Sequence, residues 1–266
     1  MKRAELCKVA DIQLLAHGLY KLKIEASDVA VSARPGQFVH IRIPGDKSRL
    51  LRRPISIYDA YHEEGNIEIV FQVVGEGTRI LSAVKPGDLL DVLGPLGNGF
   101  TIPKDTRHLF IVGGGCGVAP IKFAASKFNH TRSTCFVGFK NRDAVYGLQE
   151  FKKSCDRLLV ATEDGSIGYK GMVTEVLEDE LKQNSPDLML ACGPVPMLKV
   201  IQQMAEQFDV PCQLLLEERM GCGIGACMTC VCAVRAGEDY AYKRVCKDGP
   251  VFWSREVILG ETANEC

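Results

Sequence analysis

Four cysteines near the end of the chain have the residue type and the spacing that a redox metal centre requires. They stand as C-x4-C-x2-C with a fourth cysteine after fifteen further residues, at Cys222, Cys227, Cys230 and Cys246. Four thiolates at this spacing bind a [2Fe-2S] cluster in plant-type ferredoxins. Glycine occupies positions 221, 223 and 225, and residues without a Cβ let backbone N–H groups approach the sulfur atoms. The spacing therefore predicts an iron–sulfur cluster.

Three other interpretations of these thiols remain open. Four cysteines also bind zinc, although zinc ribbons usually have two C-x2-C pairs and only one such pair occurs here. The chain has no histidine after His130, so no imidazole can complete a zinc site in this region. The cysteines would otherwise form a disulfide or lie buried as inert thiols. We expect the nearby Cys232 to be a packed thiol rather than a ligand.

The motif Arg53-Pro54-Ile55-Ser56 has residues that a flavin nucleotide site needs. Its arginine offers a forked donor to a diphosphate, and its serine can hydrogen-bond a nitrogen of the flavin ring. Further along, Gly77-Thr78 opens a helix predicted over 78–84, whose free N–H groups would bind phosphate oxygens. Taken alone, Arg53 could equally be a solvated charge and Ser56 a turn residue. Together with the signals below, the motif predicts a flavin nucleotide site.

A glycine-rich turn indicates a second nucleotide site. It follows an apolar strand predicted over 108–112 and precedes a helix predicted over 121–128. In such a strand–turn–helix arrangement, the backbone approaches a pyrophosphate at the helix N-terminus. The pattern G-x-G-x-x-P departs at its last position from the usual dinucleotide fingerprint. The turn residues expected to bind a nicotinamide dinucleotide are Gly113, Gly114, Gly115, Gly117 and Pro120.

Two later turns fall where ligands of parallel sheets usually bind. Asp164 follows a strand predicted over 157–162, and Cys192-Gly193-Pro194 follows one predicted over 187–191. Ligands of open parallel sheets lie beyond the carboxyl ends of the strands, so both turns are candidate nucleotide contacts. Ordinary turn chemistry accounts for Asp-Gly and Gly-Pro sequences equally well. If the bound nucleotide is a nicotinamide dinucleotide, we expect Cys192 to lie near its nicotinamide ring. There the thiol would tune or shield hydride transfer.

Three regions must position these residues, and together they predict a β-barrel plus α/β fold. Residues 1–102 show short alternating runs separated by Pro-Gly turns, which predicts an antiparallel flavin-binding barrel. Residues 103–211 alternate strands with helices, which predicts a parallel-sheet nucleotide-binding domain. Residues 212–266 are too few and too rich in loops to bury their own core. We expect them to form a small C-terminal iron–sulfur lobe held together by the cluster.

The composition is that of an ordinary soluble protein. The 266 residues carry a net charge of -1, with 46% hydrophobic and 24% charged residues, so nothing favours nucleic acid or an anionic membrane. The longest uncharged stretches are shorter than the ~20 residues that span a bilayer. The start, Met1-Lys2-Arg3-Ala4-Glu5, lacks the apolar segment of a secretory leader, and most of the 12 cysteines stand singly. We therefore expect a cytoplasmic protein.

The serial order of the motifs resembles a known family over nearly the full chain. A flavin barrel, a nicotinamide-type α/β domain and a ferredoxin-like lobe in one chain resemble the ferredoxin reductase superfamily. Within it, the chain is similar to the electron transfer subunits of class B dihydroorotate dehydrogenases. The motifs that carry this similarity are Arg53 to Ser56, Gly77-Thr78, Gly113 to Pro120, Cys192 to Pro194 and Glu217 to Cys230.

The resemblance implies FAD, NAD, a [2Fe-2S] cluster on the four cysteines, and a partner. The residues that it implies for FAD are Arg53, Pro54, Ile55, Ser56, Val70, Phe71, Gln72, Gly77 and Thr78. The partner would be a catalytic subunit that carries FMN and oxidises dihydroorotate to orotate in pyrimidine biosynthesis, in a heterotetramer with two copies of each chain. Electrons would pass from that FMN through the cluster and FAD to NAD+. A flavin must stand between them because the cluster passes single electrons and NAD+ takes two.

Other functions remain open within and outside this family. Related subunits with the same parts serve sulfide dehydrogenases, hydrogenases or ferredoxin–NADP reductases, and the loop from Cys222 to Cys230 resembles the dihydroorotate group most. A zinc-stapled interaction protein on a nucleotide-binding fold would instead contain zinc and no iron. The residues leave NAD and NADP open, because Lys140-Asn141-Arg142-Asp143 offers both an acid and an arginine. The resemblance favours NAD.

Overall fold

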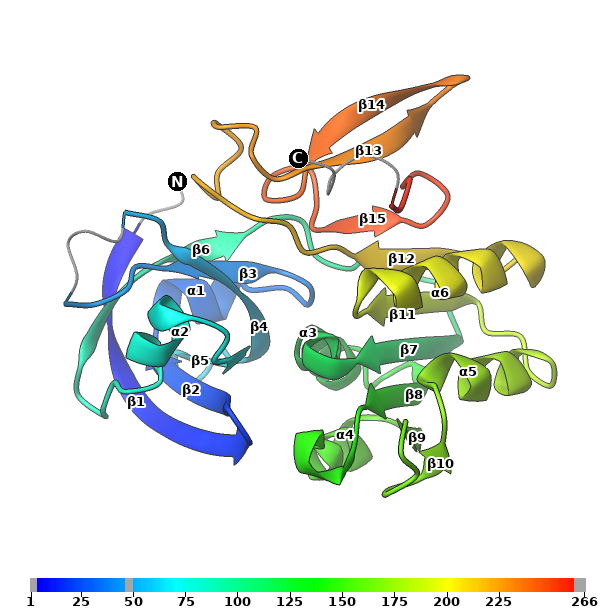
Figure 1. The fold of residues 1–266 in the computed structure, drawn as a ribbon, viewed down its shortest axis with the longest axis horizontal. Coiled ribbons are helices and arrows are strands. Elements are labelled where there is room, and N and C mark those ends of the chain that lie inside the picture. Colours follow the sequence, from blue (N-terminus) through cyan, green and yellow to red (C-terminus); the bar gives the residue numbers. More distant parts are fainter. Residues whose placement is uncertain (1–3, 46–49, 261–266) are drawn as a thin grey trace.

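The computed structural model describes residues 4–45 and 50–260. These residues form a closed six-stranded barrel, a seven-stranded sheet and a two-stranded sheet. Figure 1 shows the barrel beside the seven-stranded sheet, with the two-stranded sheet above them. The start of the chain at Met1 to Arg3, in which we expected no leader, lies outside the described residues. Among the described helices, none is both long and apolar enough to cross a membrane.

The barrel is antiparallel throughout, with the strand order β1-β2-β5-β4-β3-β6. Its strands are β1 (Ala4–Ala16), β2 (Leu19–Glu25), β3 (Phe38–Ile41), β4 (Arg53–Tyr61), β5 (Asn66–Gln72) and β6 (Leu89–Leu96), accompanied by α1 (Ser27–Ser32) and α2 (Glu76–Leu81). Alternate side chains such as Val9, Leu22 and Ile57 point inward and form its core. The Pro-Gly turns place Gly36 and Gly87 at φ 87° and 97°, a conformation that favours glycine.

The seven-stranded sheet has the order β10-β9-β8-β7-β11-β12-β15. Its strands are β7 (His108–Gly114), β8 (Arg132–Phe139), β9 (Arg157–Thr162), β10 (Tyr169–Lys170), β11 (Leu188–Cys192), β12 (Cys212–Leu215) and β15 (Val251–Trp253). All neighbouring pairs are parallel except β12 and β15. The chain order reverses between β7 and β11, so the carboxyl ends of these two strands form the switch point where such sheets bind ligands.

Helices cover both faces of this sheet. The helices are α3 (Val118–Lys127), α4 (Leu148–Ser154), α5 (Val173–Leu181) and α6 (Val195–Gln207), with 3-10 turns at Gly115–Gly117 and Arg142–Ala144. Helices α3 and α4 share a core with Leu109 and Ile111 of β7, whereas α5 and α6 share a core with Phe110 and Val112. Both faces of β7 are therefore buried, which explains its continuous apolar sequence. The predicted β-barrel plus α/β fold is confirmed.

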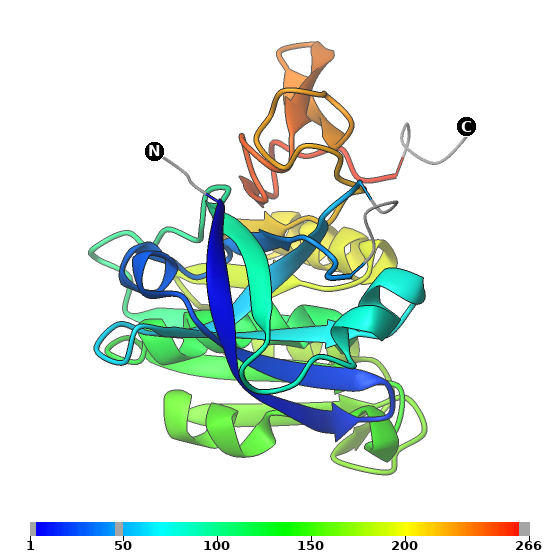
Figure 2. The same cartoon turned by 90° about the vertical axis from the view of Figure 1, so that its left-hand side faces the viewer.

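The tail of the chain belongs partly to the sheet. Residues after 211, which we assigned to the iron–sulfur lobe, supply strands β12 and β15. Between these strands the chain forms a loop and then a hairpin of β13 (Val231–Ala236) and β14 (Asp239–Arg244). Figure 2 shows the hairpin rising above both domains. The loop and hairpin are therefore attached to the sheet at both ends, through β12 before them and β15 after them.

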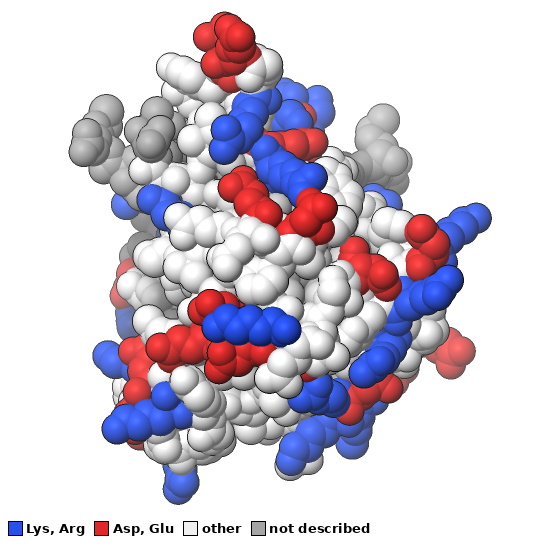
Figure 3. Space-filling model, turned by 90° about the vertical axis from the view of Figure 1, so that its right-hand side faces the viewer, with Lys and Arg blue, Asp and Glu red and all other residues white. Residues whose placement is uncertain are grey.

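Helix α3 lies between the barrel and β7 (Figure 1). Its Lys122 forms an ion pair with Asp59 of β4, and both side chains are buried. The barrel also reaches the lobe, because the side-chain amide of Asn98 donates to the carbonyls of Lys247 and Asp248 at 3.2 and 3.1 Å. On the face that Figure 3 shows, lysine and arginine side chains are interspersed with aspartate and glutamate.

Candidate flavin pocket and cluster loop

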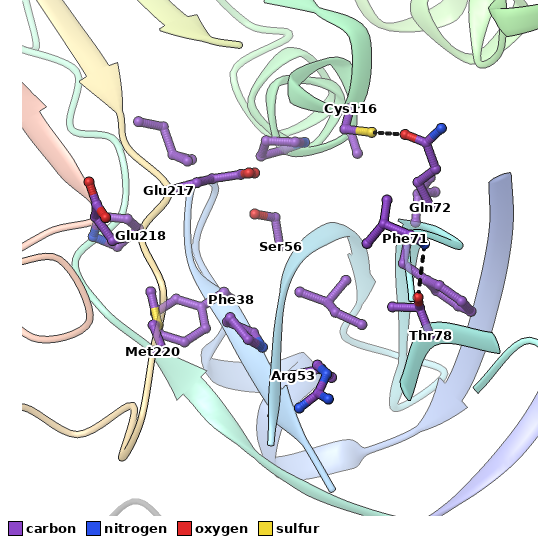
Figure 4. Close-up of a pocket in the computed structure, with 18 residues that line it drawn as sticks. Phe38, Arg53, Ser56, Phe71, Gln72, Thr78, Cys116, Glu217, Glu218 and Met220 are labelled. Atoms are coloured by element: carbon purple, nitrogen blue, oxygen red, sulfur yellow. Dashed lines mark hydrogen bonds between the residues drawn. The ribbon is translucent and has the colours of Figure 1, made fainter. Parts of the chain in front are cut away.

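A pocket opens where the barrel, the nucleotide-binding domain and the tail meet (Figure 4). Strands β3, β4 and β5 form one wall, the start of α3 forms another, and the segment after β12 forms the third. The lining residues that the sequence predicted are Arg53, Pro54, Ile55, Ser56, Val70, Phe71, Gln72, Thr78 and Pro120. The predicted flavin contacts are therefore brought together, apart from Gly77, which does not line the pocket.

The barrel wall is held by local contacts around Arg53. The Arg53 guanidinium donates to the carbonyl of Leu51 at 2.8 Å and lies against Gly77, where a Cβ would come within 2.8 Å of Arg53 Nε. Gly77 therefore makes room for the arginine. The N–H groups of Val74 and Gly75 donate to Thr78 Oγ1 at 3.0 and 3.2 Å, which fixes the start of α2. A cationic fork at the pocket wall fits the diphosphate of FAD.

The glycine-rich turn is shaped mainly by packing within the protein. A Cβ at Gly113 would lie 2.4 Å from Ile121 Cδ1, and one at Gly117 would lie 2.4 Å from the carbonyl oxygen of Cys192. A Cβ at Gly114 would likewise clash with the sulfur of Met197. Gly115 differs, because it has φ 55° and open space where a Cβ would be. Among the predicted glycines of this turn, Gly115 is the one at which no protein atom lies within 4 Å of the position of a Cβ.

The turn Cys192-Gly193-Pro194 lies at the switch point but behind the pocket wall. Cys192 pairs with Gly113 across β7 and β11, and its side chain is 1% exposed. Burial raises the pKa of the Cys192 thiol well above its ordinary value. Pro194 precedes α6, and Gly193 contacts Met197 of that helix. These residues support the glycine-rich turn, and none of them is among the lining residues of the pocket.

Asp164 lies at the carboxyl end of the sheet but outside the pocket lining. Its carboxylate accepts hydrogen bonds from the backbone N–H and the hydroxyl of Ser166 at 2.9 and 2.6 Å, and these bonds lower its pKa. Arg142, from the loop after β8, donates its backbone N–H and its guanidinium to the same Ser166. The loops after β8 and β9 are therefore tied together. Among the described residues, no side-chain hydrogen bond or ion pair joins Asp164 to the glycine-rich turn.

Several lining residues were not predicted, and Glu217 is the most notable. In Figure 4 the Glu217 carboxylate and the Ser56 hydroxyl point toward one another across the pocket. Burial raises the pKa of Glu217. Cys116, which stands opposite on the glycine-rich turn, donates its thiol to Gln72 Oε1 at 3.1 Å. Because β12 is a parallel strand that ends at Leu215, the carboxyl-end rule could have pointed to Glu217.

The cluster loop follows the third wall of the pocket directly. Met220 lines the pocket, and Cys222 is the second residue after it. The thiols lie in two pairs. Cys222 and Cys227 exchange N–H···S hydrogen bonds of 3.4 Å, and the Cys246 N–H donates to Cys230 Sγ at 3.4 Å.

Further donors surround the sulfur atoms. The Ala226 N–H donates to Cys222 Sγ at 3.2 Å, and the Thr229 hydroxyl donates to Cys227 Sγ at 3.1 Å. The Thr229 hydroxyl is the main cause of the lowered pKa of Cys227, about 6. Donors of this kind stabilise thiolates, which are the ligand form of cysteine. Two thiol pairs with N–H groups aimed at sulfur fit a two-iron centre. In the described ranges, no three Cys, His, Asp or Glu side chains converge as a single-metal site.

Two family models match the chain in the regions of the pocket and the loop. The oxidoreductase FAD-binding domain matches residues 7–100. The iron–sulfur cluster binding domain of dihydroorotate dehydrogenase B matches residues 217–258. The predictions of FAD and an iron–sulfur cluster are therefore confirmed.

The chain is similar over its length to proteins named as the electron transfer subunit of dihydroorotate dehydrogenase B (NAD(+)). The protein from Geobacillus kaustophilus is 43% identical over 261 residues, which cover 96% of this chain and 98% of the relative. That from Caldanaerobacter subterraneus is 45% identical, with 85% and 87% covered. That from Fusobacterium nucleatum is 40% identical, with 97% and 99% covered. The predicted resemblance is confirmed.

Solved structures share the fold. A chain from an NADH-dependent reduced ferredoxin–NADP oxidoreductase, studied for flavin-based electron bifurcation, has a TM-score of 0.85 and 35% identity over 97% of this chain and 92% of its own length. A ferredoxin–NADP+ reductase from Neisseria gonorrhoeae, solved with FAD and NADP bound, has a TM-score of 0.66 and 15% identity over 77% of this chain and 91% of its own. The second likeness concerns the fold alone.

Proposed function

The chain belongs to the family of electron transfer subunits of dihydroorotate dehydrogenase B, and we propose that it carries electrons from the FMN of a separate catalytic subunit to NAD+. One observation supports this function above others. The segment that closes the flavin pocket at Met220 continues directly into the cluster loop at Cys222. Two redox sites joined by so short a stretch are placed for electron exchange with each other.

The residues of the pocket have distinct tasks in this function. FAD, when bound, exchanges single electrons with the cluster and a hydride with NAD+. Arg53 would hold the diphosphate, and Ser56 would hydrogen-bond the flavin ring. Glu217 faces Ser56 from the opposite wall, and burial raises its pKa, which favours the protonated carboxyl relative to an exposed glutamate. The nicotinamide dinucleotide would approach Gly115, where no protein atom lies within 4 Å of the position of a Cβ.

The cluster cysteines lie where electrons would enter this chain from the partner subunit. Cys227 lies on an exposed part of the loop, whereas Cys230 and Cys246 are buried. The cluster is therefore open to solvent on the side of Cys227, where a partner can approach. We assign the partner as an FMN-containing catalytic subunit that oxidises dihydroorotate, in a cytoplasmic heterotetramer of two copies of each chain. NAD rather than NADP is the assigned acceptor because the relatives carry NAD(+) in their names.

Co-expression with the catalytic subunit from the same cell tests this function. The purified complex is supplied with dihydroorotate and NAD+, and orotate and NADH are measured together. We expect both products in equal amounts, and a much lower rate with NADP+. A complex that binds FAD, iron and FMN fully and yet forms no NADH would refute the proposal.

A second candidate function rests on the similarity to the ferredoxin–NADP oxidoreductase chain, at 35% identity over 97% of this chain. In that case the partner would exchange electrons with ferredoxin and a second pyridine nucleotide. The same complex separates the two functions, because a ferredoxin-dependent reaction needs no dihydroorotate. Formation of NADPH from NADP+ with NADH and reduced ferredoxin as the electron donors, and without orotate formation, would favour this second function.

A further inference from the structure

His40 of β3 is a buried histidine with no assigned role. Its side chain is 0% exposed, and neither ring nitrogen has a hydrogen-bond partner among the described residues. Burying an unpaired N–H group costs free energy, whereas an apolar side chain of similar shape would avoid that cost. Packing alone therefore does not explain a histidine at this position.

The ring faces the cluster loop through its Nδ1 edge. A Cβ at Gly223 would lie 2.3 Å from His40 Nδ1 and 3.0 Å from Cε1. Gly223 has φ 71°, so both its conformation and this close approach require glycine. Because Gly223 follows Cys222, the imidazole lies against the turn that presents the first cluster cysteine.

His40 also stands beside the flavin pocket. Phe38, two residues earlier on the same face of β3, lines that pocket. Across the β3–β4 ladder, His40 pairs with Pro54, which lines the pocket as well. The histidine is therefore placed next to both redox sites.

The ring has an N–H group to donate. A neutral imidazole carries one N–H donor. The Arg52 guanidinium donates to the backbone carbonyl of His40 at 3.2 Å, so this hydrogen bond does not involve the ring. Neither ring nitrogen has a hydrogen-bond partner among the described residues, so both remain available to a group held by the cluster loop.

We propose that His40 is a positioning residue whose Nδ1–H donates a hydrogen bond to sulfur on the Cys222 side of the iron–sulfur cluster and so raises the cluster's reduction potential. Reduction adds negative charge to the cluster, and a donor aimed at its sulfur atoms stabilises that charge. The inference rests on the cluster and not on the identity of the partner subunit.

Substitution at His40 tests the proposal in the full chain loaded with FAD and cluster. His40→Phe keeps a flat ring without a donor, and His40→Asn places an amide N–H near the position of Nδ1. The measurement is an EPR-monitored redox titration. We expect His40→Phe to shift the equilibrium toward the oxidised cluster about tenfold, which lowers the potential by about 59 mV, and His40→Asn to restore most of the difference. His108→Asn, on the distant β7, is the matched control and leaves the potential unchanged.

A potential for His40→Phe equal to that of the unsubstituted protein, at equal iron content, would overturn the proposal. A second measurement does not depend on how the variants fold. The unsubstituted protein is labelled with 15N in histidine alone, and the reduced cluster is examined by pulsed EPR. We expect a histidine nitrogen coupling that persists in His108→Asn and vanishes in His40→Asn. Absence of any such coupling in the unsubstituted protein would equally refute the hydrogen bond.

Discussion

The buried ion pair between Asp59 and Lys122 supports a quantitative prediction about how the barrel is joined to the sheet. Lys122 of α3 is 5% exposed and Asp59 of β4 is 8% exposed. The ammonium also lies 5.1 Å from the centre of the Tyr58 ring. Asp59 accepts further hydrogen bonds from the Ala60 N–H at 2.9 Å and the Ser126 hydroxyl at 3.4 Å.

Lys122→Met keeps most of the aliphatic stem but leaves the Asp59 carboxylate buried without its cation. Removing one partner of a buried pair costs about 3–5 kcal/mol. Because Asp59 keeps two hydrogen bonds, we expect the lower end of that range, about 3 kcal/mol. The double variant Lys122→Met/Asp59→Asn removes both charges, so it should recover most of the loss.

Urea unfolding of the FAD-loaded protein measures the effect. Trp253, the single tryptophan, reports on the sheet through β15, and flavin release reports on the barrel. With an m-value of about 3 kcal/mol/M, Lys122→Met should lower the urea midpoint by about 1 M. The Trp253 and flavin-release transitions should then no longer coincide. Lys127→Met, at an exposed position of the same helix, should change neither. If Lys122→Met unfolds at the midpoint of the unsubstituted protein, the ion pair does not stabilise the junction between the two domains.

Three further predictions concern the pocket and the cluster. Gly77→Val places a side chain where Arg53 lies, so the Kd for FAD should rise about tenfold or more, as measured by flavin fluorescence; unchanged affinity would remove Arg53 from the diphosphate site. Cys227→Ser should lose iron while retaining FAD, whereas Cys232→Ser should retain both, by metal analysis and absorbance. Because burial raises the pKa of Glu217, the folded flavin-free protein binds more protons than the unfolded chain, so its stability should fall as pH rises above the ordinary value of 4.5. Glu217→Gln should flatten this fall in urea titrations at several pH values, and an equal slope in both proteins would contradict the assignment.

The sequence predicted the parts of the molecule that depend on local chemistry. The spacing of the four cysteines indicated the cluster, and the apolar run before the glycine-rich turn indicated β7. Element boundaries were less accurate. We predicted that α3 begins after Pro120, but it begins at Val118, because the first turn of a helix has free N–H groups and tolerates proline. Helix α2 begins at Glu76 instead of Thr78, because Thr78 caps the N–H of Gly75.

The features that sequence reasoning missed depend on contacts between distant segments. Strands β12 and β15 are short, and their pairing joins residues on either side of the lobe. Glu217 enters the pocket because β12 ends at the same edge as β7, and the carboxyl-end rule points to Glu217 only once β12 is recognised as a strand of this sheet. The role of Gly117 in packing against Cys192 likewise follows from tertiary structure, since the glycine-rich pattern alone suggested a ligand contact.

Anaerobic addition of NADH to the purified full-length chain tests the central claim most directly, with flavin absorbance and low-temperature EPR recorded on one sample. The claim is that FAD and a two-iron cluster lie within electron-transfer reach of each other in this chain. It predicts that NADH bleaches the flavin and that a rhombic signal of the reduced cluster appears in the same sample. Flavin bleaching with full iron content and no cluster signal, even after dithionite is added, would contradict it.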